Sequence, residues 1–297
     1  MRVNPNFAPD ILNNVWQSQA EQQMALQELS TGRRVNLPSD DPAAFAADVQ
    51  NLAQQSQTDQ YLQNTSDLET LFQTADSALS SVVSSLNQAI SLGTQGANGT
   101  LTLADQQALA QQVQAIQSQI VQFANTSYQG NYIFAGTATT TKPFVMDTTQ
   151  ASGVSYNGNS QVNNVEIAEG RSIQTNLPGS QIFMASGGNV MGSLQQLVTA
   201  LKSGDTTAIG SATTALSTSL NYVSQQRVFY GSAANQLNSN QSFLQQEKVS
   251  LQTQETNLVG VDMATAATEL SQATTAHDAA LAALAKVIPT SLLDYLH

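Results

Sequence analysis

The sequence predicts a mainly α-helical protein in which long N- and C-terminal helices form a coiled-coil-like bundle, with a small all-β domain inserted in the middle. The seven prolines leave long proline-free stretches, between Pro42 and Pro143 and between Pro178 and Pro289. Proline is the strongest helix breaker, so these stretches can hold long helices. Apolar residues follow a helical period within both stretches, and this period is lost between residues 132 and 190.

The longest periodic run lies in the second stretch, where a seven-residue repeat is sustained for about six heptads, as in a coiled-coil seam. It runs from Leu216 to Leu258. At about 1.5 Å per residue, such a helix is a rod on the order of 60 Å long, which assemblies need more often than globular enzymes do. Four positions of the repeat are polar: Arg227, Gln241, Lys248 and Glu255. Such residues either fix the register between helices or lie on a solvated face, and the pattern leaves both open.

The first stretch predicts helices on either side of a glycine-rich break. Its period runs from Leu68 to Ala89, and it resumes from Leu109 to Phe123 beyond segment 93–99. Between the helical arms we expect strands at Asn131–Phe134 and Arg171–Leu177.

An Asn-Gly pair favours a hairpin turn in the middle segment. Asn157–Gly158 stands between Val154–Tyr156 and Val162–Ile167. Because Asn-Gly readily supplies the positive φ angles of a type I′ turn, we expect these two segments to pair as a hairpin.

These patterns divide the chain into three parts. Segments 1–40 and 259–297 form a terminal helical coil, segments 41–131 and 191–258 form a helical rod, and segment 132–190 forms a small β domain. The ends of an inserted domain must lie close together, because the helical body continues on both sides of it.

Composition excludes several classes of function. The net charge is −12, and the nine basic residues are spread singly except for Arg33–Arg34. No basic stripe is present to neutralise phosphates or anionic lipid, so we expect neither nucleic acid nor a membrane surface as a partner. The chain has no cysteine, which excludes disulfides, thiolate catalysis and cysteine-based metal sites.

The residues needed for catalysis are also missing. The histidines are His277 and the last residue, His297, with no His or Glu at metal-ligand spacing. We therefore expect no catalytic, cofactor-binding or metal-binding residues. The paired acids Asp40 and Asp41 precede Pro42, and this order is typical of a helix N-cap followed by proline at the first helical position.

Gly32 suits a left-handed cap at the end of the preceding helix. No apolar segment or small-residue cleavage site marks residues 1–15, and no run approaches the roughly 18 apolar residues of a membrane span. We therefore expect neither a Sec-type signal peptide nor a membrane anchor.

Both ends of the chain resemble the bacterial flagellin family. Segments 29–36 and 39–43 (LSTGRRVN and SDDPA) are similar to its N-terminal signature, and the C-terminal run from Val261–Ala264 to Ser291–Leu296 is similar to its matching end. Gly130–Gly136 (GNYIFAG), the 156–159 turn and the ending Leu292–Tyr295 resemble the branch that joins hook and filament. Leu37–Pro38 departs from the pattern, where small or polar residues are commoner.

The resemblance implies a structural subunit and not an enzyme. It implies a homo-oligomeric ring of copies at the hook–filament junction, with hook-associated protein 1 on the hook side and flagellin, which assembles on the ring, on the filament side. It implies an extracellular place in the flagellum, reached through the flagellar type III export apparatus without a cleaved signal, after binding of an export chaperone. The terminal helices would form an inner tube.

We expect the assembly contacts on the terminal helices, at Leu12, Val15, Trp16, Leu26, Leu29, Leu270, Leu281, Leu284, Leu292 and Leu293. A buried methylene contributes roughly 0.8 kcal/mol, whereas ordering a residue's backbone costs about 1–2 kcal/mol. The C-terminal helix offers many small and polar residues to its partner. The coil of about 40 residues at each end is therefore expected to be mobile in the free monomer and ordered by neighbouring copies.

Three alternatives remain. The chain could be the filament flagellin itself. It could be a surface adhesin for glycan or a host receptor, although the aromatic residues of the middle segment mostly alternate as core residues do. It could be a lytic enzyme carried on a fibre, although Asp147, Glu166 and Glu169 are the only acids between residues 131 and 190.

Overall fold

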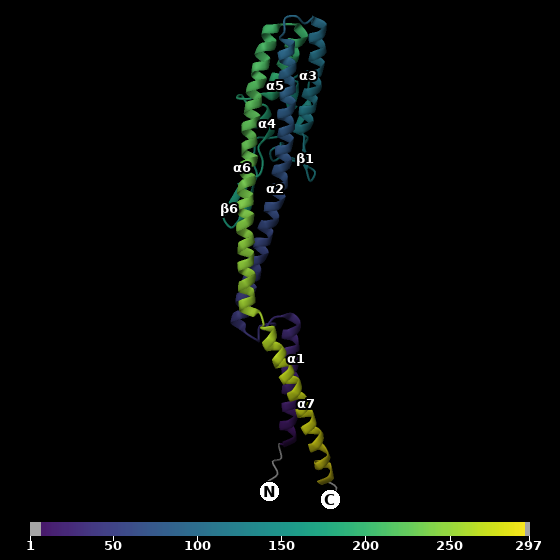
Figure 1. Cartoon of the computed structure of the whole chain (residues 1–297), viewed down its shortest axis with the longest axis vertical. Coiled ribbons are helices and arrows are strands. Elements are labelled where there is room, and N and C mark those ends of the chain that lie inside the picture. The colour runs from purple at the N-terminus through teal and green to yellow at the C-terminus, as the bar shows by residue number, and fades with distance from the viewer. Residues whose placement is uncertain (1–6, 295–297) are drawn as a thin grey trace. The chain divides into compact units, whose positions relative to one another are not determined.

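A computed structural model describes the backbone of residues 7–294 and the side chains of residues 12–285 (Figure 1). The chain separates into a terminal unit, Met1–Thr58 with Gln246–His297, and a central unit, Asp59–Gln245. The helices are α1 (Phe7–Thr31), α2 (Pro42–Gly96), α3 (Leu103–Ala124), α4 (Gly179–Phe183), α5 (Val190–Ser203), α6 (Thr206–Val259) and α7 (Met263–Asp294). The prediction of a mainly helical fold with long helices and a small strand-bearing middle is confirmed.

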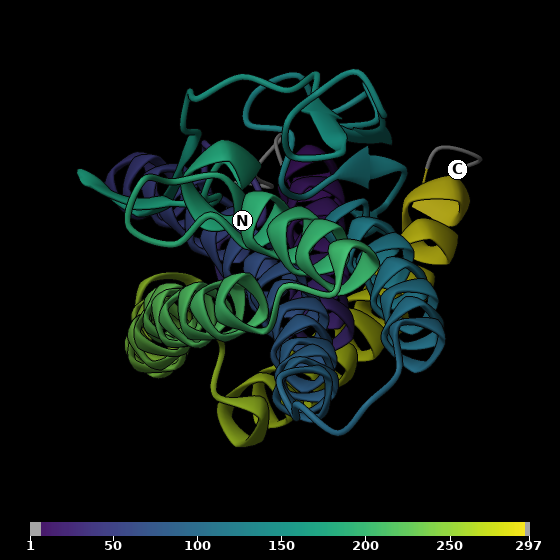
Figure 2. The same ribbon diagram turned by 90° about the horizontal axis from the view of Figure 1, so that it is seen from above.

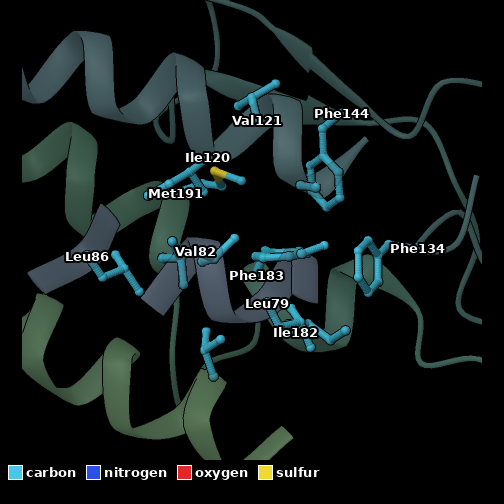
Figure 3. Close-up of a cluster of buried hydrophobic side chains, with 14 of the residues drawn as sticks. Leu79, Val82, Leu86, Ile120, Val121, Phe134, Phe144, Ile182, Phe183 and Met191 are labelled. Carbon is cyan, nitrogen blue, oxygen red and sulfur yellow. The ribbon is translucent and has the colours of Figure 1, made fainter. Parts of the chain in front are cut away.

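The central unit packs α2, α3, α5 and α6 around one apolar core. Seen from above, its strand-bearing segment gathers on one side of these helices (Figure 2). Leu79, Val82 and Leu86 of α2 face Ile120 of α3 in the core, as the helical period predicted (Figure 3).

The strand-bearing segment contributes aromatic side chains to the same core. Phe183 packs edge-on against Phe134 and Phe144, with ring centroids 5.6 and 5.3 Å away (Figure 3). All three side chains are fully buried. Edge-to-face aromatic pairs add to the stabilisation that burial alone provides, so the strands and the helices of the central unit stabilise one another.

The glycine-rich segment breaks the helix later than expected. Helix α2 continues through Gly93 to Gly96, and α3 begins at Leu103 after a capping box between Thr102 and Asp105. Gly93 and Gly96 are tolerated inside α2 because they lie against other helices. A Cβ atom at either position would collide with Thr213 or Leu201.

The middle segment contains three antiparallel strand pairs. They are β1 (Ser127–Tyr128) with β2 (Asn131–Tyr132), β3 (Phe144–Met146) with β4 (Val154–Tyr156), and β5 (Asn164–Ala168) with β6 (Arg171–Gln174). In the second pair, Phe144 lies opposite Tyr156 and Met146 opposite Val154. The positive φ angles of a tight hairpin occur at Gln129 and Gly130, between β1 and β2.

The predicted hairpin at Asn157–Gly158 is wrong, because β4 pairs with the preceding β3 and β5 with the following β6. Gly158 has no positive φ and serves close packing instead. A Cβ atom there would lie 2.5 Å from the Tyr156 hydroxyl. That hydroxyl donates a hydrogen bond toward the carbonyl oxygens of Phe134 (3.0 Å) and Asn159 (2.9 Å).

Polar residues of α6 contact the neighbouring elements. Arg227 donates two hydrogen bonds to Asp76 of α2, at 2.8 and 2.9 Å, which supports a register role for this polar position. Asn240 is buried, and its amide donates to the Ile167 carbonyl of β5 at 2.7 Å. Asn64 of α2 does the same to the Glu166 carbonyl at 3.0 Å. Side-chain amides of α2 and α6 therefore bind two adjacent backbone carbonyls of β5.

Candidate assembly surface

The two chain connections of the terminal unit, residues 32–41 and 260–262, are hydrogen-bonded to each other, and we call them the joint. The Arg34 amide donates to the Val259 carbonyl (2.7 Å), and the Val261 amide donates to the Gly32 carbonyl (3.1 Å). Gly32 has a φ of 69° and its amide donates to Glu28 at 2.8 Å, so the backbone turns in the left-handed region that glycine favours. The joint fixes where α1 ends and α7 begins.

Arg33 links the joint to α2 and α6 by ion pairs. Its guanidinium donates to Asp48 of α2 and, at 3.0 Å, to Glu255 of α6. The Asp48 side chain is only 3% exposed, and Arg33 is its ion-pair partner. Gln55 also donates to Glu255, at 2.9 Å. Glu255 is thus the second polar position of the long repeat that links helices.

Of the paired acids of the joint, Asp41 caps α2 and Asp40 closes the turn before it. Asp41 accepts a hydrogen bond from the Ala44 amide at 3.0 Å, and Pro42 is the first residue of α2. Asp40 accepts from the Asn36 and Leu37 amides at 3.0 and 2.8 Å. These backbone donors lower the pKa of both carboxyl groups, which favours the charged form and opposes an acid–base role.

Asp262 has the same arrangement at the start of α7. It accepts a hydrogen bond from the Ala264 amide at 3.0 Å, and that bond lowers the pKa of its carboxyl group. Sequence reasoning did not assign this residue as a cap, although an Asp directly before a helical run is a recognisable N-cap signal.

Helices α1 and α7 pack along each other with small and polar side chains between them. The buried residues are Val15, Ser18 and Ala25 of α1 and Ala266 and Ala273 of α7. Ser18 Oγ donates to the Val15 carbonyl and lies 3.2 Å from Nδ1 of His277. Gln22 donates to Thr274 at 3.3 Å. The pairings Ser18–His277 and Gln22–Thr274 establish that the helices run antiparallel.

The residues expected to make assembly contacts differ in how far their side chains are exposed. Val15 is buried in the coil, and Leu29, Leu270 and Leu284 are partly buried. Leu12, Trp16, Leu26 and Leu281 are exposed, at 43, 66, 56 and 44%. Leu292 and Leu293 lie outside the residues whose side chains are described.

Helix α1 therefore carries two rows of side chains with the same heptad spacing. The inner row faces α7 and consists of Val15, Ser18, Gln22, Ala25 and Leu29. The outer row is exposed throughout and consists of Leu12, Trp16, Gln19, Gln23, Leu26 and Ser30. At 3.6 residues per turn the rows are about 100° apart around the helix. The outer row has the spacing of a second packing seam, and none of the described helices covers it.

An acidic groove runs beside the inner row. It has a volume of about 370 Å³ and is lined by Glu21, Met24, Ala25, Glu28, Glu269, Gln272, Ala273 and Ala276. Partial burial of Glu28, and next the negative charge of Glu269 across the coil, raise the pKa of the Glu28 carboxyl group. The coil is therefore opposed by like charges at neutral pH.

Features of other classes of site are missing from the described residues. No group of three or more His, Asp or Glu side chains within them could hold a metal ion. None of the described helices is long and apolar enough to cross a membrane. A charge-fixed joint, an antiparallel coil with a small-residue interior and an exposed apolar row on α1 are features of a helical structural protein.

Comparison with known proteins identifies the family. The model of the bacterial flagellin N-terminal helical region matches residues 5–139, and that of the flagellin C-terminal helical region matches residues 213–296. These matched regions contain α1 and the described part of α7, with the joint between them. The chain belongs to the bacterial flagellin family.

Individual relatives agree with the family models. The flagellar hook-associated protein 3 of Salmonella typhimurium is 33% identical over 173 residues, which cover 58% of this chain and 53% of that protein. The protein of the same name from Escherichia coli is 29% identical over 84% of this chain and 85% of its own length. The match thus spans about half of the first relative and most of the second.

A solved structure shares the fold. The flagellar hook-associated protein 3 of Legionella pneumophila aligns with 70% of this chain and 98% of its own, with a TM-score of 0.63 at 14% identity. The chain is a structural protein of the bacterial flagellum, and its relatives are structural proteins and not enzymes.

Replacing Arg33 by alanine tests the joint. The substitution leaves the buried Asp48 carboxylate without its cation, which costs about 3 kcal/mol of unfolding free energy; this is the low end for a broken buried pair, since the Arg33 side chain is 34% exposed. Chemical denaturation followed by circular dichroism measures the loss. The matched control is Arg171→Ala on β6, an exposed arginine whose removal should change stability by less than about 0.5 kcal/mol. Equal losses in the two variants would contradict the account.

The Glu28 pKa predicts a pH dependence. Because this pKa is raised in the fold above its usual value of 4.5, the group favours the folded coil below that value, and the benefit is lost as pH rises through the raised pKa. Glu28→Gln should therefore raise the melting temperature near pH 7 and lose this advantage near about pH 4. Glu247→Gln, which removes the same charge from an exposed site on α6, is the control. A Glu28→Gln variant that is less stable than the parent at neutral pH would refute the repulsion.

Proposed function

We propose that the chain forms a ring of copies at the junction between the flagellar hook and the filament, on which flagellin assembles. The observation that carries the proposal is the exposed outer row of α1 on a coil whose own interior is small and polar. The names of the relatives, hook-associated protein 3, favour the junction over other places in the flagellum.

The energetics explain why such a coil requires neighbours. Between the two helices, Ala25, Ala266 and Ala273 each bury little more than a methyl group, worth roughly 0.8 kcal/mol, while each ordered residue costs about 1–2 kcal/mol of backbone entropy. Burial of the outer row by a neighbouring copy supplies the missing stabilising free energy. Covering a large side chain such as Leu12 or Leu26 contributes roughly 1.5–3 kcal/mol, and aromatic residues such as Trp16 are typical interface anchors.

In this proposal the three parts of the chain have different roles. The terminal coil, 1–40 with 259–297, forms an inner tube, the rod of 41–131 with 191–258 forms a middle layer, and the 132–190 segment faces outward. Hook-associated protein 1 lies on the hook side and flagellin on the filament side. An export chaperone holds the chain until the flagellar export apparatus passes it outside without cleavage.

The alternative role is that of the filament flagellin itself, which is favoured by the match of both ends to flagellin models. The two roles differ in what the purified chain builds. A junction subunit forms short rings or stays monomeric, whereas a filament flagellin grows long filaments alone.

A strain that lacks this chain tests the junction role. Electron microscopy should find hooks without filaments, with flagellin shed into the medium, because flagellin has no ring on which to assemble. The chain supplied from a plasmid should restore filaments, and a Trp16→Ala chain should restore far fewer. A Gln107→Ala chain, altered at an exposed site on α3, is the control and should restore them fully. Normal filaments in the deletion strain, or full rescue by Trp16→Ala, would contradict the proposal.

A further inference from the structure

The outer row of α1 has a polar middle. Gln19 and Gln23 stand between Trp16 and Leu26, and all four side chains are exposed. Within the described residues neither amide forms a hydrogen bond, although the two glutamines are one helical turn apart. Other glutamines of this helix do pair, since Gln17 donates to Glu21 and Gln22 to Thr274. Within the described residues Gln27 also forms no side-chain hydrogen bond, so what distinguishes Gln19 and Gln23 is their position between the apolar side chains of the outer row.

A partner helix that covers the outer row must supply hydrogen-bonding groups as well as apolar ones. An amide that is buried without a partner costs roughly 1–3 kcal/mol. A partner helix must therefore bring hydrogen-bonding groups to the level of Gln19 and Gln23 and apolar groups to the levels of Leu12, Trp16 and Leu26. Polar residues within apolar seams fix register in this way, at some cost in stability.

We propose that Gln19 and Gln23 set the axial register between neighbouring copies of this chain. The proposal rests on the assembly of copies described above and names the residues that make it uniform. The occupant of the outer row is the α1–α7 coil of a second copy, because the row shares its helix and its heptad spacing with the seam that already binds α7. The row itself carries no charge, so it does not select a strongly charged partner.

The coil also offers a complementary surface. A ring needs two different surfaces on each copy, because head-to-tail contacts pair unlike patches. Met263 and Leu281 of α7 are exposed, at 51 and 44%, and they stand eighteen positions apart, which returns to the same side of the helix after five turns. The outer row of one α1 against this flank of the next copy's α7, beside Thr274, would pair two unlike patches.

Ammonium sulfate titration of the purified full chain tests the register. Sulfate strengthens apolar burial and brings the chain to association, which light scattering detects and electron microscopy describes. The double variant Gln19→Leu/Gln23→Leu should associate at a lower sulfate concentration than the parent, because two more apolar side chains are covered. Its particles should vary in width, because no amide pairing selects one register, while the parent forms uniform particles.

The matched control is Gln107→Leu/Gln111→Leu on α3, where both glutamines are exposed, four residues apart and outside the coil. It should behave like the parent in both readouts. Uniform particles from the outer-row variant, or particles from the parent that are no more uniform, would overturn the register proposal.

A Trp16→Ala variant in the same titration separates this proposal from the assembly surface itself. One outcome is that Trp16→Ala requires more sulfate for association while the Gln19→Leu/Gln23→Leu variant still forms particles of uniform width. That result would support the outer row as the assembly surface and would contradict the register role of the two glutamines. If Trp16→Ala associates like the parent, the outer row is not the interface, and both proposals fall.

Discussion

The interior of the α1–α7 coil is built from small and polar side chains, and this constraint governs the terminal unit. Among the described side chains of α1 and α7, Val15 is the only Val, Leu or Ile that is buried. Ser18, Ala25, Ala266 and Ala273 fill the other buried positions. Small side chains let the helices approach closely, but they withdraw little apolar surface from water. Leu12, Trp16 and Leu26 stand exposed on the outer row of α1, where we propose that a neighbouring copy covers them.

The joint holds the adjoining ends of α1 and α7 with ion pairs and backbone hydrogen bonds. Arg33 connects α2 and α6 through Asp48 and Glu255, and the backbone bonds of Arg34 and Val261 tie the two chain connections together. Helix formation has a costly first turn. A joint that already fixes the end of α1 and the start of α7 reduces that cost, so in the proposed assembly the coil extends from the joint as neighbours cover its outer row.

Much of the fold could be predicted from proline placement and heptad period, because long helices repeat one local rule many times. The β3–β4 pairing could not. Strands of three residues carry no measurable period, and the Tyr156 hydroxyl of β4 bonds to the carbonyl of Phe134, which lies 22 positions away in the sequence. Asn157–Gly158 forms no hairpin turn, because Gly158 has no positive φ and packs against Tyr156 instead.

For the proposed assembly surface, the sequence pointed to α1 but could not separate its two rows. Leu12, Trp16 and Leu26 have the same four-three spacing as Val15 and its row, so the period alone does not say which row α7 covers. The part played by Arg33 was also out of reach, since Glu255 lies 222 positions away in the sequence. Only the fold brings these charges together.

Amide hydrogen exchange of the free chain and of the assembled chain tests the central claim most directly, that neighbours complete the coil. In the free chain, amides of segments 12–30 and 263–285 should exchange much faster than those of α3 in the central unit. In the assembled chain they should become protected, with the largest change around Trp16. Coil amides in the free chain that are as protected as those of α3 would show that the coil is stable by itself, and would contradict the account.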